Sequence, residues 1–163
     1  MKKRIYLVLE VKGRELDSRL SFSIYAAQNG YSVTVCKKGY LLSKLKYLKP
    51  GIVILKSIGI KNIKFIKEIK KYGHKCCSMD EEGLLFWTPE IYCRKRINEE
   101  IMSSIDFLFM WGINDYQAVL EKYPQYKKKL KITGSPRFDL LKPPLRKIYE
   151  EDSKILKEKS GKF

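Results

Sequence analysis

Short apolar runs alternate with amphipathic segments along most of this chain. Six short runs are predicted to be strands: 5–9, 31–36, 52–55, 74–79, 106–111 and 130–133. All but 74–79 contain β-branched or aromatic residues, which are typical of strands. The segments between them have helical spacing; the clearest cover 15–29, 40–48, 62–72 and 89–104, and another ends at Glu121. This alternation predicts an α/β fold, a Rossmann-like, doubly wound and mostly parallel sheet of about six strands.

Two of the predicted helices end at a glycine. The first has an apolar stripe formed by Leu16, Leu20, Ile24 and Ala27. It stops at Gly30, and the helix over 62–72 stops in the same way at Gly73. Glycine readily takes the left-handed conformation that closes a helix, so both boundaries support the predicted fold.

The composition changes at Pro143 and Pro144. Residues 1–142 carry the strand–helix repeat, whereas 143–163 are highly charged with sparse apolar positions. We therefore expect a Rossmann-like domain over 1–142. A charged linker helix over 143–163 would then lead toward a second domain that is absent from this sequence.

Composition narrows the class of protein. The 163 residues are 44% hydrophobic, which suffices for one folded domain. No apolar run approaches the roughly 18–20 residues needed to cross a bilayer, and no signal-peptide core follows Met1, so a cytoplasmic location is expected. The four cysteines lack C-x-x-C spacing and His74 is the only histidine, which argues against a metal site.

The net charge of +16 would attract nucleic acid, an anionic membrane surface or an acidic substrate. Only seven of the 34 basic residues are arginines, and the lysines spread along helical segments in the manner of solvated faces. No motif of a DNA- or RNA-binding module is present, so nucleic acid is not the expected partner.

Charged residues follow the first predicted strand and enter the helix after it. Glu10, Arg14, Asp17 and Arg19 are the candidates here. A strand end followed by a helix N-terminus can hold an anionic group, and arginine adds bidentate donors for carboxylate or phosphate. The structural alternative is that Asp17 and Arg19 are first-turn helix charges and that Arg14 is a solvated loop residue.

A second acidic segment follows the fourth strand. Asp80, Glu81 and Glu82, with Gly83 after them, precede the apolar residues 84–87. Burial beside Phe86 and Trp87 would raise the pKa of a carboxyl group toward the range of a general base. The residues do not say which carboxylate would act, and a solvated acidic loop is the alternative.

Two further features lie at the ends of the fifth and sixth strands. Trp111 could form a wall for a sugar ring or pack in the core. In the segment 134–139, Arg137 and Asp139 could pair with each other or contact a ligand, while the glycine and proline favour a structural turn.

No nucleotide cofactor is expected. The first strand–helix turn contains a single glycine, Gly13, where the dinucleotide fingerprint requires three, and the G-x-x-x-x-G-K-[ST] phosphate loop is missing.

Four segments then carry a resemblance in order along the chain: 7–20 (LVLEVKGRELDSRL), 39–54 (GYLLSKLKYLKPGIVI), 79–87 (MDEEGLLFW) and 132–141 (ITGSPRFDLL). Together they resemble the amino-terminal half of the surface carbohydrate biosynthesis proteins. These are bacterial proteins with a GT-B-like architecture of two Rossmann domains, related to the glycosyltransferases of capsule and lipopolysaccharide synthesis.

The resemblance implies transfer of a sugar from a nucleotide donor to a glycan acceptor at the inner membrane face. A carboxylate of residues 80–82, or Asp17, would deprotonate the acceptor, while Arg14 and Arg19 would hold an acidic group. No metal would be needed, because helix dipoles and basic side chains offset the leaving phosphate. The chain would be the acceptor-side half, with the donor-binding domain missing or carried by a separate polypeptide.

Two other function classes stay open. One is a non-catalytic module that binds an acidic glycan or a protein partner. The other is a basic protein whose charge alone recruits it to a membrane or nucleic acid.

Overall fold

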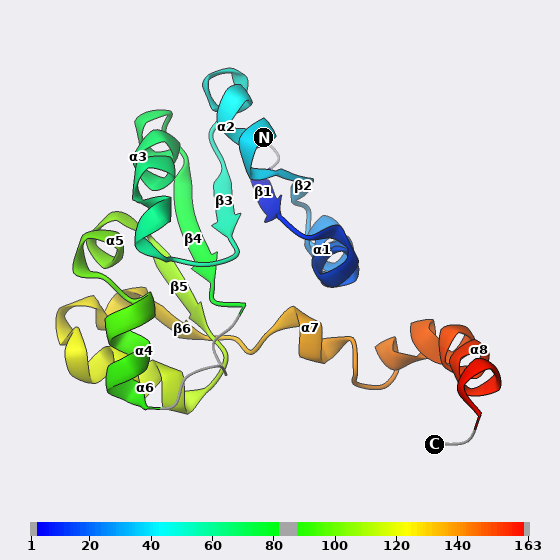
Figure 1. Cartoon of the computed structure of the whole chain (residues 1–163). Coiled ribbons are helices and arrows are strands. Elements are labelled where there is room, and N and C mark those ends of the chain that lie inside the picture. Colours follow the sequence, from blue (N-terminus) through cyan, green and yellow to red (C-terminus); the bar gives the residue numbers. More distant parts are fainter. Residues whose placement is uncertain (1–2, 82–87, 162–163) are drawn as a thin grey trace.

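The computed structural model describes residues 3–81 and 88–161. In this part of the chain, six parallel strands form one sheet in the order β2-β1-β3-β4-β5-β6 (Figure 1). The strands are β1 (Arg4–Leu9), β2 (Ser32–Lys37), β3 (Ile52–Leu55), β4 (Lys75–Met79), β5 (Phe107–Met110) and β6 (Leu130–Ile132). Together with the helices that flank it, this sheet confirms the predicted Rossmann-like α/β fold.

The helices connect and cover these strands. They are α1 (Lys12–Gln28), α2 (Lys38–Lys44), α3 (Ile63–Lys71), α4 (Pro89–Arg96), α5 (Glu99–Ser104), α6 (Ile113–Lys122), α7 (Pro136–Asp139) and α8 (Glu150–Ser160). Short 3-10 helices lie at η1 (Leu45–Tyr47), η2 (Ile60–Asn62), η3 (Pro124–Lys129) and η4 (Leu145–Tyr149). Gly30 (φ 83°) and Gly73 (φ 76°) follow α1 and α3 in the left-handed conformation, as predicted.

The predicted helix over 89–104 is in fact two helices, α4 and α5. Asn98 separates them, because its side-chain Oδ1 accepts hydrogen bonds from the backbone N–H groups of Glu100 (2.8 Å) and Ile101 (3.4 Å). These bonds satisfy donors that would otherwise be free at the start of a new helix. The chain therefore turns at Asn98 and enters α5, which leads to β5.

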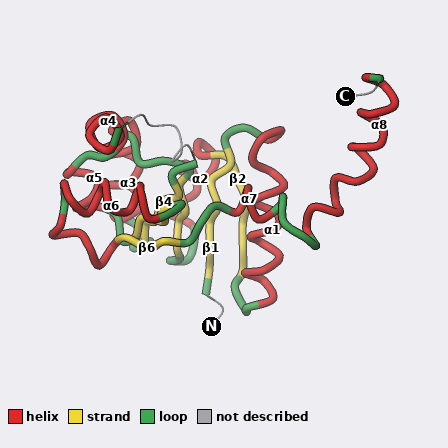
Figure 2. Tube along the Cα trace, turned by 90° about the horizontal axis from the view of Figure 1, so that it is seen from below, coloured by secondary structure: helices red, strands yellow, loops and turns green. Residues whose placement is uncertain are grey.

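The two faces of the sheet are covered unequally. Helices α2 to α6 contribute side chains to the larger core, whereas α1 supplies Ala26 and Phe22 to the smaller core on the other face. Figure 2 shows α1 set apart from α4, α5 and α6. On β4, Cys76 belongs to the larger core and its neighbour Cys77 to the smaller one, because successive strand residues point to opposite faces.

The apolar stripe predicted for the first helix does not face the sheet. Leu20 and Ile24 are 46% and 61% exposed, while Ser18, Arg19 and Ala26 are buried. The outward stripe instead lines an apolar cavity of about 460 Å³ together with residues of the segment after α7, namely Leu140, Leu145 and Ile148. The stripe thus belongs to a surface partly covered by the end of the chain.

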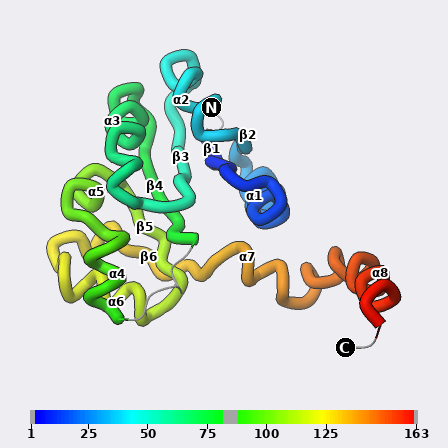
Figure 3. Tube along the Cα trace, viewed as in Figure 1, coloured from blue at the N-terminus to red at the C-terminus, as the bar shows by residue number. Residues whose placement is uncertain are grey.

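The segment after β6 runs past α1 and away from the sheet (Figure 3). Tyr149 is tied to α1, since its hydroxyl donates a hydrogen bond to Asp17 Oδ2 at 3.0 Å. All residues of α8 are exposed. Among the described residues, no helix combines the length and apolar character required to cross a membrane.

Candidate functional site at the carboxyl edge of the sheet

The parallel strands bring the loops that follow them to one edge of the sheet. The chain runs from β1 outward to β2 and then returns to β3 on the other side of β1, so the strand order reverses between β1 and β3. Ligands of open α/β sheets bind outside the carboxyl ends of the strands at such a switch point. Helix α1, which follows β1, contacts the end of β4 here, because Arg19 Nη2 lies 2.8 Å from Glu81 Oε1.

Lys56 lies directly after β3 and contacts acidic residues that follow β1, on the other side of the switch point. Its Nζ is 3.2 Å from Glu10 Oε2 and 3.3 Å from Glu15 Oε1. Arg14 Nη2 also lies 3.3 Å from Glu15 Oε1. Glu10 and Arg14, both predicted to bind substrate, are therefore engaged with charges of the chain itself.

Glu15 is the centre of this network. Its side chain is fully buried, and Oε2 accepts a hydrogen bond from the backbone N–H of Glu10 at 2.8 Å. Burial raises the pKa of Glu15, but the backbone N–H groups of Glu10 and Val11, together with Lys56 and Arg14, outweigh burial and lower it below 4.5. The carboxylate is thus held in its charged form.

The buried pair of Arg19 and Glu81 connects α1 to the end of β4. The side chains are 1% and 6% exposed. Arg19 Nη1 donates to Met79 Sδ at 3.6 Å, but no N–H of Nη2 is aligned with the nearby Glu81 oxygen. Among the described residues, Arg19 Nε and Glu81 Oε2 have no hydrogen-bond partner, so the pair is incompletely satisfied.

Asp80 is held more completely than Glu81. Arg96 on α4 binds it through two nitrogens, with Nε 3.1 Å from Oδ2 and Nη2 2.6 Å from Oδ1. Burial and the neighbouring Asp80 carboxylate raise the pKa of Tyr92. Through these two bonds Asp80 holds α4 against the end of β4. Of the two described carboxylates in this acidic segment, Glu81 is the one with an unsatisfied oxygen.

A small cavity of about 180 Å³ lies beside Glu81. Its lining combines the charged side chains of Lys56, Glu81, Lys95 and Arg96 with Ser57 and Gly59. Lys95 is exposed, and within the described part of the chain it has no ion-pair partner. The cavity is predominantly cationic and has one buried carboxylate at its side.

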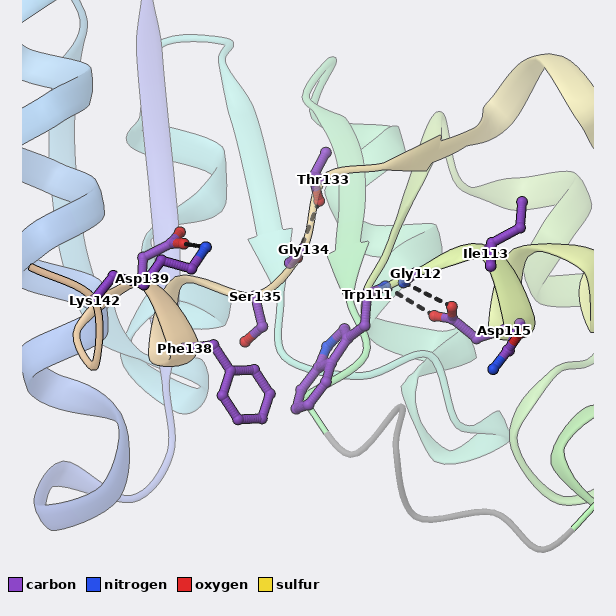
Figure 4. A pocket seen from close by; sticks show the side chains of 11 residues that line it. Trp111, Gly112, Ile113, Asp115, Thr133, Gly134, Ser135, Phe138, Asp139 and Lys142 are labelled. Carbon is purple, nitrogen blue, oxygen red and sulfur yellow. Dashed lines mark hydrogen bonds and ion pairs between the residues drawn. The ribbon is translucent and has the colours of Figure 1, made fainter.

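A larger cavity, of about 690 Å³, lies at the ends of β5 and β6 (Figure 4). Trp111 and Phe138 form an edge-to-face pair beside it, with ring centroids 5.1 Å apart and planes at 87°. Thr133, Ser135 and Asn114 add polar groups to its lining. An aromatic surface with nearby hydroxyl and amide groups can bind the apolar face and the hydroxyls of a sugar ring.

Asp115 closes the N-terminus of α6 at the edge of this cavity. Its Oδ2 and Oδ1 accept hydrogen bonds from the backbone N–H groups of Trp111 and Gly112, each at 2.8 Å. Since a side chain of the protein already uses these two donors, they are not open to a ligand phosphate. The cap also fixes the backbone that carries Trp111.

The other predicted site residues lie in different places. Asp17 is exposed on the outward face of α1, where it binds Tyr149 rather than facing the charged network. Asp139 lines the larger cavity and pairs with Lys142 Nζ at 2.9 Å, not with Arg137, which is half-buried. Glu82 and Gly83 lie outside the described residues.

Four residues of the site were not predicted from the sequence: Lys56, Lys95, Arg96 and Asp115. Lys56 follows the end of a predicted strand, which is the same signal that selected Glu10. Asp115 stands three residues after Gly112, the spacing of a helix cap. Lys95 and Arg96 carry no such signal. Arg96 belongs to the site through its pair with Asp80, and Lys95 through the cavity that it lines with Glu81, so both depend on residues distant in sequence.

No protein-family model matches the chain, and no curated protein is detectably similar to it in sequence. Among the described residues, no group of three or more histidine, cysteine or acidic side chains is placed to hold a metal ion.

Proposed function

We propose that this chain forms the acceptor-side wall of a glycosyltransferase site in the synthesis of a surface polysaccharide such as capsule or lipopolysaccharide. The observation that carries the proposal is the 690 Å³ cavity with its Trp111–Phe138 pair at the carboxyl edge of a Rossmann-like sheet. The sequence resemblance to surface carbohydrate biosynthesis proteins supports the same function.

In this proposal the glycan acceptor binds along the edge from the aromatic cavity toward β4. Glu81 is then the described residue best suited to accept the proton of the acceptor hydroxyl, because one of its oxygens is unsatisfied and Asp80 is occupied by Arg96. A nucleotide sugar would approach the acceptor from the side facing away from this sheet. It would be held by a second Rossmann-like domain in the same or another polypeptide.

The outward apolar stripe of α1 offers a surface for such a second domain. Leu20, Ile24 and Tyr25 are 46%, 61% and 69% exposed, and they adjoin the apolar cavity under the segment after α7. Exposed apolar surface of this kind is typical of interfaces between domains or proteins.

Saturation-transfer NMR with acidic and neutral oligosaccharides tests the proposal. We expect saturation of sugar protons by the native chain, loss of the signal in Trp111→Ala and Phe138→Ala, and an unchanged signal in Tyr25→Ala as the exposed aromatic control. Absence of binding at about 10 mM oligosaccharide would overturn the proposal. Binding without sugar transfer, even after addition of the donor domain, would favour the non-catalytic glycan-binding module.

A second candidate function is attachment to an anionic membrane surface. The segment 40–49, which runs from α2 to just past η1, exposes aromatic and aliphatic side chains among lysines: Tyr40, Leu42, Lys44, Lys46, Tyr47 and Lys49. Such residues bind lipid headgroups and the outer part of the acyl region. Sedimentation with phosphatidylglycerol vesicles should be reduced in the double variant Lys44→Glu and Lys46→Glu more than in Lys128→Glu. Equal reductions would indicate a response to net charge alone.

A further inference from the structure

The small cavity is lined by Glu81, a buried carboxylate with an unsatisfied oxygen, and by cations of which only some have an acidic partner. Glu81 Oε2 is buried and has no hydrogen-bond donor among the described residues, although Oε1 lies against Arg19. A buried carboxylate oxygen without a donor is unfavourable, so a group that supplies an O–H or N–H would stabilise this arrangement.

The cationic side chains that line this cavity differ in whether they have an acidic partner. Lys56 is paired with Glu10 and Glu15, and Arg96 with Asp80. Lys95 has no counter-ion among the described residues. An anion bound in the cavity would therefore pair with Lys95, which is more exposed than Lys56 and Arg96.

We propose that this cavity is a binding subsite for a group that carries a hydroxyl next to a carboxylate or a phosphate, such as an acidic sugar residue. The hydroxyl would donate to Glu81, and the anion would bind Lys95. Glu81 and Lys95 are thus the residues that set the specificity for an acidic ligand. The inference deepens the proposed function, since it defines the acceptor as an acidic glycan and rests on carbohydrate binding at this sheet edge.

The position and size of the cavity fit this ligand. It lies at the ends of β3 and β4, next to the switch point where ligands of open α/β sheets bind. A volume of about 180 Å³ admits one monosaccharide-sized group and excludes a nucleotide, whose bound volume falls in the 300–1,000 Å³ range of larger ligand pockets. The cavity therefore selects a small charged end group.

Calorimetry and thermal unfolding with four probes test the inference: D-glucuronate, D-glucose 6-phosphate, D-glucose and inorganic phosphate. We expect glucuronate or glucose 6-phosphate to bind and to raise Tm. Glucose, which lacks the anion, and phosphate, which lacks the sugar hydroxyls, should each bind about tenfold or more weakly, because each loses a hydrogen bond to a charged group. The stronger of the first two probes identifies a carboxylate or a phosphate as the natural anion.

Three variants complete the test. Lys95→Ala, an exposed position where folding should be unaffected, should weaken the acidic sugar about tenfold or more and leave glucose unchanged. Glu81→Gln should also weaken it, although loss of the partner of Arg19 will lower Tm. Lys128→Ala, on η3 before the amino end of β6, is the matched control and should bind as the native chain does.

Two results would overturn the inference: equal binding of phosphate and of both acidic sugars, or equal weakening by Lys95→Ala and Lys128→Ala. Either would show attraction to net charge alone. All measurements are made without a sugar donor, so they stand apart from the test at Trp111. If the acidic sugars do not bind but oligosaccharides still bind in a Trp111-dependent way, only this inference is rejected. If the acidic sugars bind but Trp111-dependent oligosaccharide binding is absent, only the aromatic site is rejected.

Discussion

The two halves of the carboxyl edge use their polar groups differently. At β1, β3 and β4, the charged half, Glu15 and Asp80 are buried and bound by cations of the same chain. At β5 and β6, the aromatic half, the polar groups of Thr133 and Ser135 surround an open cavity beside Trp111. The dense charges predicted from sequence therefore mark where the fold is held together, and only a few of those groups are left for a ligand.

The buried pair of the charged half should give the largest effect on stability. Arg19→Ala leaves the Glu81 carboxylate without its cation in a buried position, so the free energy of unfolding should fall by about 3–5 kcal/mol. Urea unfolding measures the change. Arg14→Ala is the control, because this partner of Glu15 is 41% exposed and its loss should cost under about 1 kcal/mol. Similar losses in both variants would contradict the distinction between buried and exposed pairs.

In the aromatic half, the cap on α6 should give the next largest effect. Asp115→Ala removes the acceptor for two backbone N–H groups and should lower the free energy of unfolding by about 1–3 kcal/mol. Asp115→Asn keeps one acceptor oxygen and should lose less. Asp152→Ala, on the exposed helix α8, should leave the unfolding midpoint unchanged. A native midpoint for Asp115→Ala would show that the cap does not organise the cavity.

The aromatic pair should give a smaller effect. A double-mutant cycle with Trp111→Ala and Phe138→Ala should yield a coupling energy of about 0.5–1.5 kcal/mol, as expected for edge-to-face rings 5.1 Å apart. Calorimetric unfolding of the native chain, both single variants and the double variant gives this value. A coupling energy near zero would mean that the two rings line the cavity independently.

The smallest expected effect is a pH dependence confined to the charged half. The pKa of Glu15 is lower in the folded chain than its ordinary value of 4.5. The stability that this carboxylate contributes is present above 4.5 and is lost as the pH falls through its folded pKa. The unfolding free energy of the native chain should therefore decline below about pH 4.5 more steeply than that of Glu15→Gln. Identical slopes would assign the acid sensitivity to other carboxylates.

The fold was largely predictable from sequence, because strand boundaries are set by local signals. The apolar runs end at glycines or charges, and Gly30 and Gly73 have the left-handed backbone that their position predicted. The break at Asn98 was also encoded locally, since the residue can cap a helix, but the apolar residues around it continued the helical pattern. At Asn98 the capping signal outweighs the helical periodicity of the neighbouring residues.

The orientation of α1 was not predictable from periodicity. The stripe of Leu20 and Ile24 has the spacing of a core face, yet the buried face includes Glu15 and Arg19. Pairing explains the reversal: Glu15 meets Lys56, and Arg19 meets Glu81, over separations of 41 and 62 residues along the printed sequence. A local hydrophobic pattern places charged residues on the solvent side of a helix, because it carries no information about partners so far away in the sequence. The same limit explains why the charged half of the site was assigned to ligands.

The adjacent thiols on β4 provide a way to time the opening of each face of the sheet. A thiol reacts with an alkylating reagent as its thiolate, and burial raises the pKa of Cys77 to about 11 and that of Cys76 further still. Modification therefore requires exposure of the buried side chain. Because Cys76 belongs to the larger core and Cys77 to the smaller one, peptide mapping of alkylation over time would give two separate rates. A faster rate at Cys77 would mean that α1 detaches from the sheet before helices α2 to α6 do. The two neighbouring cysteines would then report separately on the opening of the two faces of β4.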